Sequence, residues 1–98
     1  MKKYLLLLNG QNFWLNYDGK PQRIGFFTNR FIRAESEREA EYLGVQMIQE
    51  DKDLFSRLLN DNLDPPMIYV DEIEEIGSSG GIDNPSLSYM FYPEENNA

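Results

Sequence analysis

Residues 22–50 read QRIGFFTNRFIRAESEREAEYLGVQMIQE, and this stretch decides the fold that the sequence predicts. Residues 23–33 predict one long strand, on which successive side chains point to opposite faces of a sheet. One predicted face carries Ile24, Phe26, Thr28, Arg30 and Ile32. The other predicted face carries Arg23, Gly25, Phe27, Asn29, Phe31 and Arg33. Because neither face is wholly apolar, we expect a bulge near Thr28 and Asn29.

A helix is expected directly after this strand. Ser36 and Glu39 form a capping box, in which the Ser36 hydroxyl accepts from the Glu39 amide and the Glu39 carboxylate reaches back to Ser36. An apolar stripe with helical spacing follows, formed by Ala40, Leu43, Gly44, Met47 and Ile48. A second, shorter helical turn is expected over residues 54–59, and the proline pair at residues 65–66 prevents its continuation.

Three shorter apolar runs predict the remaining strands, at residues 3–8, 13–17 and 67–70. The Asn-Gly pair at residues 9–10 predicts a hairpin turn between the first two runs. A second turn is expected at residues 18–21, where glycine and proline favour the backbone angles of a turn. After Val70 the alternation slips before Ile73, which predicts a bulge or the strand end there.

The order of these elements predicts an α+β domain over residues 1–76. Its antiparallel sheet of about four strands would carry one main helix and a short second helix on one face, in a ferredoxin-like or related arrangement. Residues 77–98 are expected to be a flexible linker, GSSGGIDNPS, followed by the apolar tail segment LSYMFY. That segment would add a strand to a sheet edge, either of its own chain, of a partner or of a second copy.

The 98 residues carry a formal net charge of −8, which is divided unevenly along the chain. Residues 1–33 hold six basic residues and one acid, a net charge of +5, whereas residues 34–98 hold three basic residues and sixteen acids, a net charge of −13. Such asymmetry is typical of a chain that binds a charged partner, but it also fits a fold whose two parts pair with each other. We favour pairing within the fold, since a nucleic-acid-binding domain is normally basic as a whole.

The chain contains no cysteine and no histidine, which excludes disulfides, Ser-His and Cys-His nucleophiles and zinc sites with nitrogen and sulfur ligands. Glu72 and Glu74 would share a strand face, but an acidic strand edge explains such a pair better than a glycosidase site does. Residues 60–64 match only the start of a calcium loop, because Pro65 stands where that loop needs glycine. We therefore expect no enzyme activity, no cofactor and no metal.

The first residues raise the question of a signal peptide. Lys2 and Lys3 precede an apolar run over residues 4–8, which is too short for the apolar core of such a peptide. No stretch approaches the roughly 18 apolar residues of a membrane span. We expect the cytoplasm as the compartment.

The segments GFFTNRFIRAESEREAE, residues 25–41, and PPMIYVDEIEEI, residues 65–76, resemble those of a group of small bacterial proteins of unknown function. The shared pattern is an aromatic strand, a capped helix and an acidic strand preceded by two prolines. It spans about residues 4–76 and leaves out the tail. The resemblance implies a small α+β domain and no activity, and it supplies no site residues.

The second strand face and the tail hold more aromatic side chains than a solvated surface needs, which indicates a contact surface. We predict a non-catalytic cytoplasmic protein-interaction module that forms a homodimer through the sheet aromatics and the C-terminal tail. The predicted contact residues are Phe27, Arg30, Phe31, Arg33, Glu72, Glu74, Tyr89, Phe91 and Tyr92.

Two alternative functions stay open. The first is a small acidic inhibitor or immunity-type protein that binds a basic partner. Its contact residues would be Glu35, Glu37, Glu41, Asp71, Glu72, Glu74 and Glu75. The second is single-stranded nucleic-acid binding on the strand that interleaves Arg23, Arg30 and Arg33 with phenylalanines. The net charge of −8 makes nucleic acid the less favoured partner, because it opposes the approach of phosphate.

Overall fold

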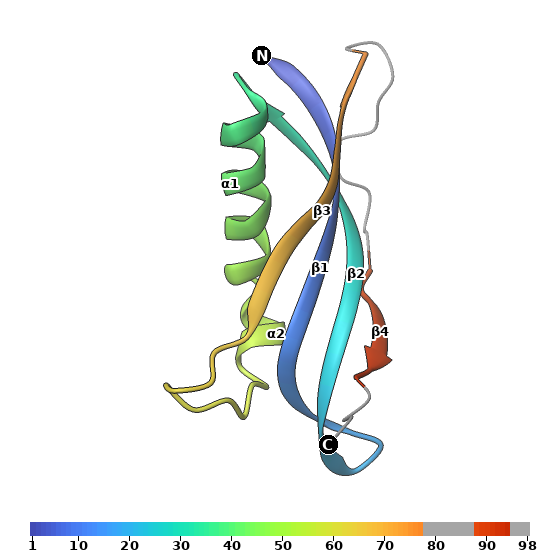
Figure 1. The fold of residues 1–98 in the computed structure, drawn as a ribbon, viewed down its shortest axis with the longest axis vertical. Coiled ribbons are helices and arrows are strands. Elements are labelled where there is room, and N and C mark those ends of the chain that lie inside the picture. The colour runs from blue at the N-terminus through green and yellow to red at the C-terminus, as the bar shows by residue number, and fades with distance from the viewer. Residues whose placement is uncertain (78–87, 95–98) are drawn as a thin grey trace.

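The computed structural model describes residues 1–77 and 88–94. Within them the chain forms a four-stranded antiparallel sheet and two helices (Figure 1). The strands are β1 (Lys2–Tyr17), β2 (Lys20–Ala34), β3 (Met67–Ile76) and β4 (Met90–Pro93), and the helices are α1 (Glu37–Gln49) and α2 (Lys52–Phe55). The predicted α+β class, with one main and one short helix, is confirmed.

A long hairpin of β1 and β2 forms the centre of the sheet. The two strands pair over nearly their whole length, from Lys2 opposite Ala34 to Tyr17 opposite Lys20. Residues 18–19 make the turn, and both take positive φ angles, of 55° and 78°. A tight hairpin turn of this kind requires positive φ at both central positions, so the turn predicted at this place is confirmed.

The hairpin turn predicted at residues 9–10 is wrong, because β1 continues through these residues as one strand. The pairing register shifts just after them, and Asn12 takes a positive φ of 61°. The side-chain amide of Asn12 donates to Asp64 Oδ1 and its backbone N–H donates to Glu94 Oε1, both at 2.8 Å. Partners far away in the sequence thus hold this segment as an irregularity within the strand.

Strand β2 alternates regularly along its length, and the predicted assignment of its two faces is confirmed. Phe26 and Ile32 are buried on the face toward the helices, whereas Phe27 is exposed on the other face. The bulge expected near Thr28 and Asn29 is wrong. Thr28 pairs with Leu8 in the regular register, and its polar side chain is buried. The strand therefore accommodates polar residues on this face without a bulge.

The slip expected between Val70 and Ile73 is confirmed as a bulge in β3. Leu8 of β1 lies opposite Val70 and Leu7 lies opposite Glu72, so Asp71 has no direct partner on β1. An extra residue of this kind returns the later side chains to the correct face of the sheet.

The strand order in the sheet is β3-β1-β2-β4. Because β1 is antiparallel to both of its neighbours, β2 and β3 run in the same direction on either side of it. Both helices lie in the single connection between β2 and β3, whereas a ferredoxin-like fold has two separate helical crossovers. The ferredoxin-like topology is therefore not confirmed.

Residues 88–94, which include all of the predicted tail segment LSYMFY except its undescribed first residue, dock on their own chain. Strand β4 pairs antiparallel with β2, from Ile24 opposite Pro93 to Phe27 opposite Met90. Most of the linker predicted over residues 77–86 lies outside the described residues.

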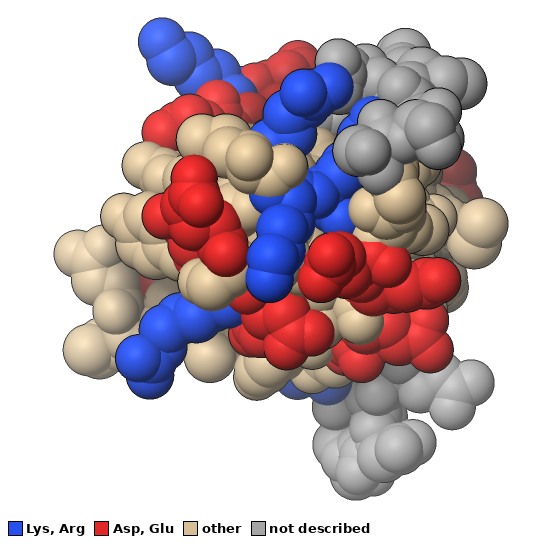
Figure 2. Space-filling model, turned by 90° about the horizontal axis from the view of Figure 1, so that it is seen from above, with Lys and Arg blue, Asp and Glu red and all other residues tan. Residues whose placement is uncertain are grey.

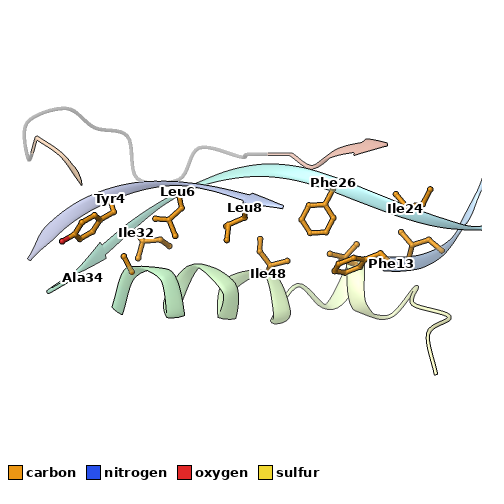
Figure 3. Close-up of a cluster of buried hydrophobic side chains, with 12 residues drawn as sticks. Tyr4, Leu6, Leu8, Phe13, Ile24, Phe26, Ile32, Ala34 and Ile48 are labelled. Atoms are coloured by element: carbon orange, nitrogen blue, oxygen red, sulfur yellow. The ribbon is translucent and has the colours of Figure 1, made fainter. Parts of the chain in front are cut away.

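The core lies between the sheet and the helices, as Figure 3 shows for its main side chains. Helix α1 contributes Ala40, Gly44 and Ile48, three members of the predicted apolar stripe. The core residues are Tyr4, Leu6, Leu8, Phe13, Leu15, Ile24, Phe26, Ile32, Ala34, Ala40, Ile48 and Leu54. We call the side of the sheet that packs on this core the helix face and the opposite side the outer face.

Both helices begin at a capping side chain. Ser36 Oγ accepts from the Glu39 N–H at 3.2 Å, as predicted, but the Glu39 carboxylate accepts from the N–H of Glu35 at 3.0 Å and not from that of Ser36. Asp51 caps α2, which begins at Lys52, so the second helix starts earlier than predicted.

Candidate interaction surface

The structure divides the nine predicted contact residues between the two faces of the sheet. Side chains of directly opposed residues lie on the same face, which assigns each one. The outer face carries Phe27, Phe31, Arg33, Glu72, Glu74 and Tyr92. The helix face carries Arg30, Tyr89 and Phe91. The predicted surface is therefore not one continuous patch.

Tyr92 lies across the outer face from β4 over β2 to β1. A Cβ atom placed on Gly25 would be 2.3 Å from the Tyr92 ring, so only glycine leaves room for the ring there. The Tyr92 hydroxyl accepts a 2.9 Å hydrogen bond from Nδ2 of buried Asn9, and the Phe27 ring lies 5.4 Å from the Tyr92 ring. These contacts form a platform across three strands, and no local pattern in the sequence predicts the Asn9 contact.

The rows of the outer face run from β3 through β1 to β2. One row holds Tyr69, Asn9 and Phe27, and these residues are directly opposite one another. The next rows, towards the end of β3, are Glu72–Leu7–Asn29, Glu74–Leu5–Phe31 and Ile76–Lys3–Arg33. Because β1 lies between β2 and β3, no arginine of β2 lies directly opposite an acid of β3.

Several large apolar side chains of the outer face are exposed to solvent. Tyr69 and Met67 of β3 are 43% and 44% exposed, Phe27 of β2 is 36% exposed, and Met90 of β4 is 72% exposed. Both helices pack on the opposite side of the sheet (Figures 1 and 3). Exposed apolar groups gathered on one face are typical of a protein-interaction site.

On the helix face, Arg30 has an internal structural role. Its side chain is only 9% exposed and its guanidinium lies 5.3 Å from the centre of the Tyr89 ring. It donates to Thr28 Oγ1 and, at 2.8 Å, to the carbonyl oxygen of Asn29. The alternation of β2 had already assigned Arg30 to the same face as the core residues.

Tyr89 connects the tail segment to the helix layer. Its hydroxyl donates a 2.6 Å hydrogen bond to Asp51 Oδ2, and its ring packs against Phe26 at 4.8 Å. Burial, together with the Asp51 carboxylate, raises the pKa of Tyr89 far above its ordinary value. The hydrogen bond from Tyr89 holds the pKa of Asp51 below its ordinary value. The sequence did not predict that Asp51 contacts the tail. Its only sequence signal is that an aspartate directly before a helix is a common N-cap.

Two surface pockets adjoin the helices. A pocket of about 460 Å³ lies between α1 and β2 and is lined by Phe31, Ile32, Arg33, Leu43, Gln46, Met47 and Glu50. A second pocket, of about 310 Å³, is lined by Leu15, Asn16, Tyr17, Asp51, Asp53, Leu54, Arg57, Tyr89 and Phe91. Acidic and basic side chains both line each pocket. Neither pocket therefore indicates whether its ligand would be an anion or a cation.

Acidic and basic side chains lie together at one end of the molecule (Figure 2). Figure 2 looks down on the end that carries the start of α1 and the end of β3, and acidic and basic side chains lie there side by side. The β3 acids Asp71, Glu72, Glu74 and Glu75 are all exposed. No ion pair joins any of these four carboxylates to a basic side chain of the described residues.

Within the described part of the chain, no group of three or more metal-ligating side chains is close enough together to hold a metal ion. Among the same residues, no helix combines the length and the apolar content that crossing a membrane requires. No protein-family model, curated protein or solved structure matches this chain. The resemblance to small bacterial proteins of unknown function therefore stays a prediction.

Proposed function

We propose that the chain is a non-catalytic protein-interaction module that forms a homodimer through the outer face of its sheet. The observation that carries this proposal is the group of exposed apolar side chains on that face: Phe27, Met67, Tyr69 and Met90. Burying apolar surface contributes roughly 25 cal/mol per Å², so a face of this kind gains free energy when a second copy covers it. A two-fold axis would place the same patch on both sides of the interface.

The sequence predicted that the tail aromatics contact the second copy, but in the structure the tail contributes mainly through Met90. Tyr92 packs on β2 and β1 of its own chain, and Tyr89 bonds to Asp51. These two aromatic residues therefore hold the tail on its own chain, Tyr92 on the outer face and Tyr89 on the helix face. Met90, which is directly opposite Phe27, is the tail residue that extends the exposed apolar surface.

The mass of the protein in solution tests the proposal. Light scattering coupled to size-exclusion chromatography should give twice the chain mass for the wild type. The double substitution Phe27→Ser with Tyr69→Ser should reduce the mass to that of one chain. Tyr42→Ser is the matched control, because Tyr42 is 66% exposed on α1, on the other side of the sheet. A wild type that stays monomeric at high concentration would overturn the homodimer.

The acidic surface favours a second candidate function, the binding of a basic partner. The exposed β3 acids have no ion-pair partner among the described residues, and the first turn of α1 adds Glu37 and Glu39. Opposite charge on a partner would speed association and select that partner. The nucleic-acid alternative has less support, because Arg30 packs on the helix face, on the opposite side of the sheet from Arg23 and Arg33.

A further inference from the structure

Strand β3 is an edge strand of the sheet. It pairs with β1 along one side, and no backbone group of the described residues pairs with its other side. In Figure 1, β3 lies at the opposite edge of the sheet from β4. A strand in this position presents a row of free N–H and C=O groups that can bond to a further extended chain.

The two halves of this edge differ in character. Residues 67–70 include Met67 and Tyr69, which are exposed on the outer face, and no charged residue. Residues 71–75 include four acids and the bulge at Asp71. Charges and bulges blunt a strand edge against unwanted pairing, but here they protect only the second half. The first half is apolar and open.

The side chains of β3 follow a definite order on the outer face. The bulge keeps Met67, Tyr69, Glu72 and Glu74 on that face, opposite Gln11, Asn9, Leu7 and Leu5 of β1. A chain added antiparallel to β3 would place its own alternate side chains beside these four residues. It would meet the two glutamates first and the two apolar side chains afterwards.

We propose that the outer edge of β3 binds an extended segment of a partner protein that carries basic residues opposite Glu72 and Glu74 and apolar residues opposite Tyr69 and Met67. The unpaired backbone edge of β3 is the binding site. The charges of Glu72 and Glu74 determine only which kind of segment binds there. This inference rests on the proposed function as an interaction module, to which it adds the partner's chemistry.

A second copy of this chain fits the β3 edge less well. Residues 67–76 contain no lysine or arginine, so the same strand of a second copy offers no cation to the four carboxylates. A parallel copy in register would place acid beside acid, and like charges directly opposite each other destabilise strand pairing. A basic segment removes both difficulties, and main-chain hydrogen bonds to the edge supply affinity.

Fluorescence anisotropy with synthetic ten-residue peptides tests this inference. The probe peptide alternates side chains in the order lysine, lysine, leucine, leucine on one face, with threonine between them. Its first control has glutamate in place of lysine. Its second control keeps the sequence but carries N-methyl groups on alternate amides, which remove the hydrogen-bond donors along one edge. We expect the probe to bind and both controls to bind at least tenfold more weakly.

Matched protein variants locate the binding site. Glu74→Lys should weaken binding roughly tenfold, because it places like charges opposite each other at the edge. Asp53→Lys makes the same change of charge on α2, where Asp53 is 80% exposed, and should leave the affinity within about twofold. Equal weakening by the two variants, or equal binding of the N-methylated peptide, would overturn strand pairing at β3.

The mass of the same samples separates this inference from the proposed function. A dimeric protein that does not bind the probe peptide would overturn the β3 inference and leave the homodimer standing. A monomeric protein that binds the probe with the expected controls would support the inference and overturn the homodimer.

Discussion

The hydroxyl of Tyr89 donates a 2.6 Å hydrogen bond to Oδ2 of Asp51, the N-cap residue of α2. The other carboxylate oxygen of Asp51 accepts from the N–H of Leu54 at 3.1 Å. One aspartate therefore both begins a helix and holds the tail segment, although Tyr89 follows it by 38 residues. This link joins β4 to the helix layer independently of the strand pairing with β2.

Removing the Tyr89 hydroxyl should destabilise the fold. Tyr89→Phe keeps the ring on Phe26 but deletes the hydrogen bond to a charged acceptor, and such bonds contribute roughly 1.5–3 kcal/mol. We expect a decrease of about 1–2 kcal/mol in the free energy of unfolding, measured by urea titration. Tyr42→Phe removes an exposed hydroxyl and should change it by less than about 0.5 kcal/mol. Equal effects would show that the Tyr89–Asp51 bond contributes nothing.

The same link should make stability depend on pH in the acid range. The pKa of Asp51 is lower in the folded chain than its ordinary value, mainly through the bond from Tyr89. The unfolded chain therefore binds the proton first as the pH falls. The stabilisation is present above about pH 4 and is lost as the pH falls through the folded-state pKa.

Asp51→Asn isolates this contribution, since asparagine also caps helices. The free energy of unfolding of Asp51→Asn should fall less steeply than that of the wild type between about pH 5 and pH 3. Asp53→Asn, on the exposed side of α2, should keep the wild-type slope. If both variants kept that slope, the Asp51 pKa shift would have no effect on folding.

Gly25 should tolerate no side chain while Tyr92 is in place. A Cβ atom there would lie 2.3 Å from the Tyr92 ring, so Gly25→Ala should cost about 1–3 kcal/mol through displacement of the ring. In a Tyr92→Ala background the same substitution should cost much less, and a double-mutant cycle measures the difference. Gly77→Ala, where a Cβ atom would meet nothing within 4 Å, is the control. If the costs of Gly25→Ala and Tyr92→Ala were additive, the contact between Gly25 and the Tyr92 ring would be contradicted.

Charge reversal at Arg30, compared with charge reversal at Arg38, tests whether Arg30 stabilises the fold. Arg30→Glu would bury a carboxylate close to Asp51 and should destabilise the fold by more than about 3 kcal/mol. Arg38 is exposed on α1, and Arg38→Glu should cost less than about 0.5 kcal/mol. Thermal unfolding followed by circular dichroism distinguishes the two. A soluble, stable Arg30→Glu variant would contradict the internal role of this arginine.

Elements with a strong local pattern were predictable from the sequence. The alternation of side chains along β2 correctly predicted which residues share each face of the strand. The capping pattern at Ser36 predicted the start of α1 to within a residue. The slip after Val70 gave the β3 bulge. Each of these features depends on residues that are close in the sequence, where spacing and hydrogen-bond geometry are decisive.

Features held by distant contacts were not predictable in the same way. The Asn-Gly pair of β1 looks like a hairpin turn, but Asn9 bonds to the Phe26 carbonyl and to Tyr92, and Asn12 bonds to Glu94. These tertiary contacts outweigh the turn propensity. The position of Tyr89 was not predictable for the same reason, since only the fold shows that its hydroxyl reaches Asp51.

The most direct test of the homodimer through the outer face is an isotope-filtered NOE spectrum of a mixture of labelled and unlabelled chains. We predict cross-peaks between the methyl groups of Met67 and Met90 on one copy and ring protons of Phe27 or Tyr69 on the other. Intermolecular cross-peaks that involve only α1 residues such as Tyr42, or no such cross-peaks at millimolar concentration, would contradict the proposed interface.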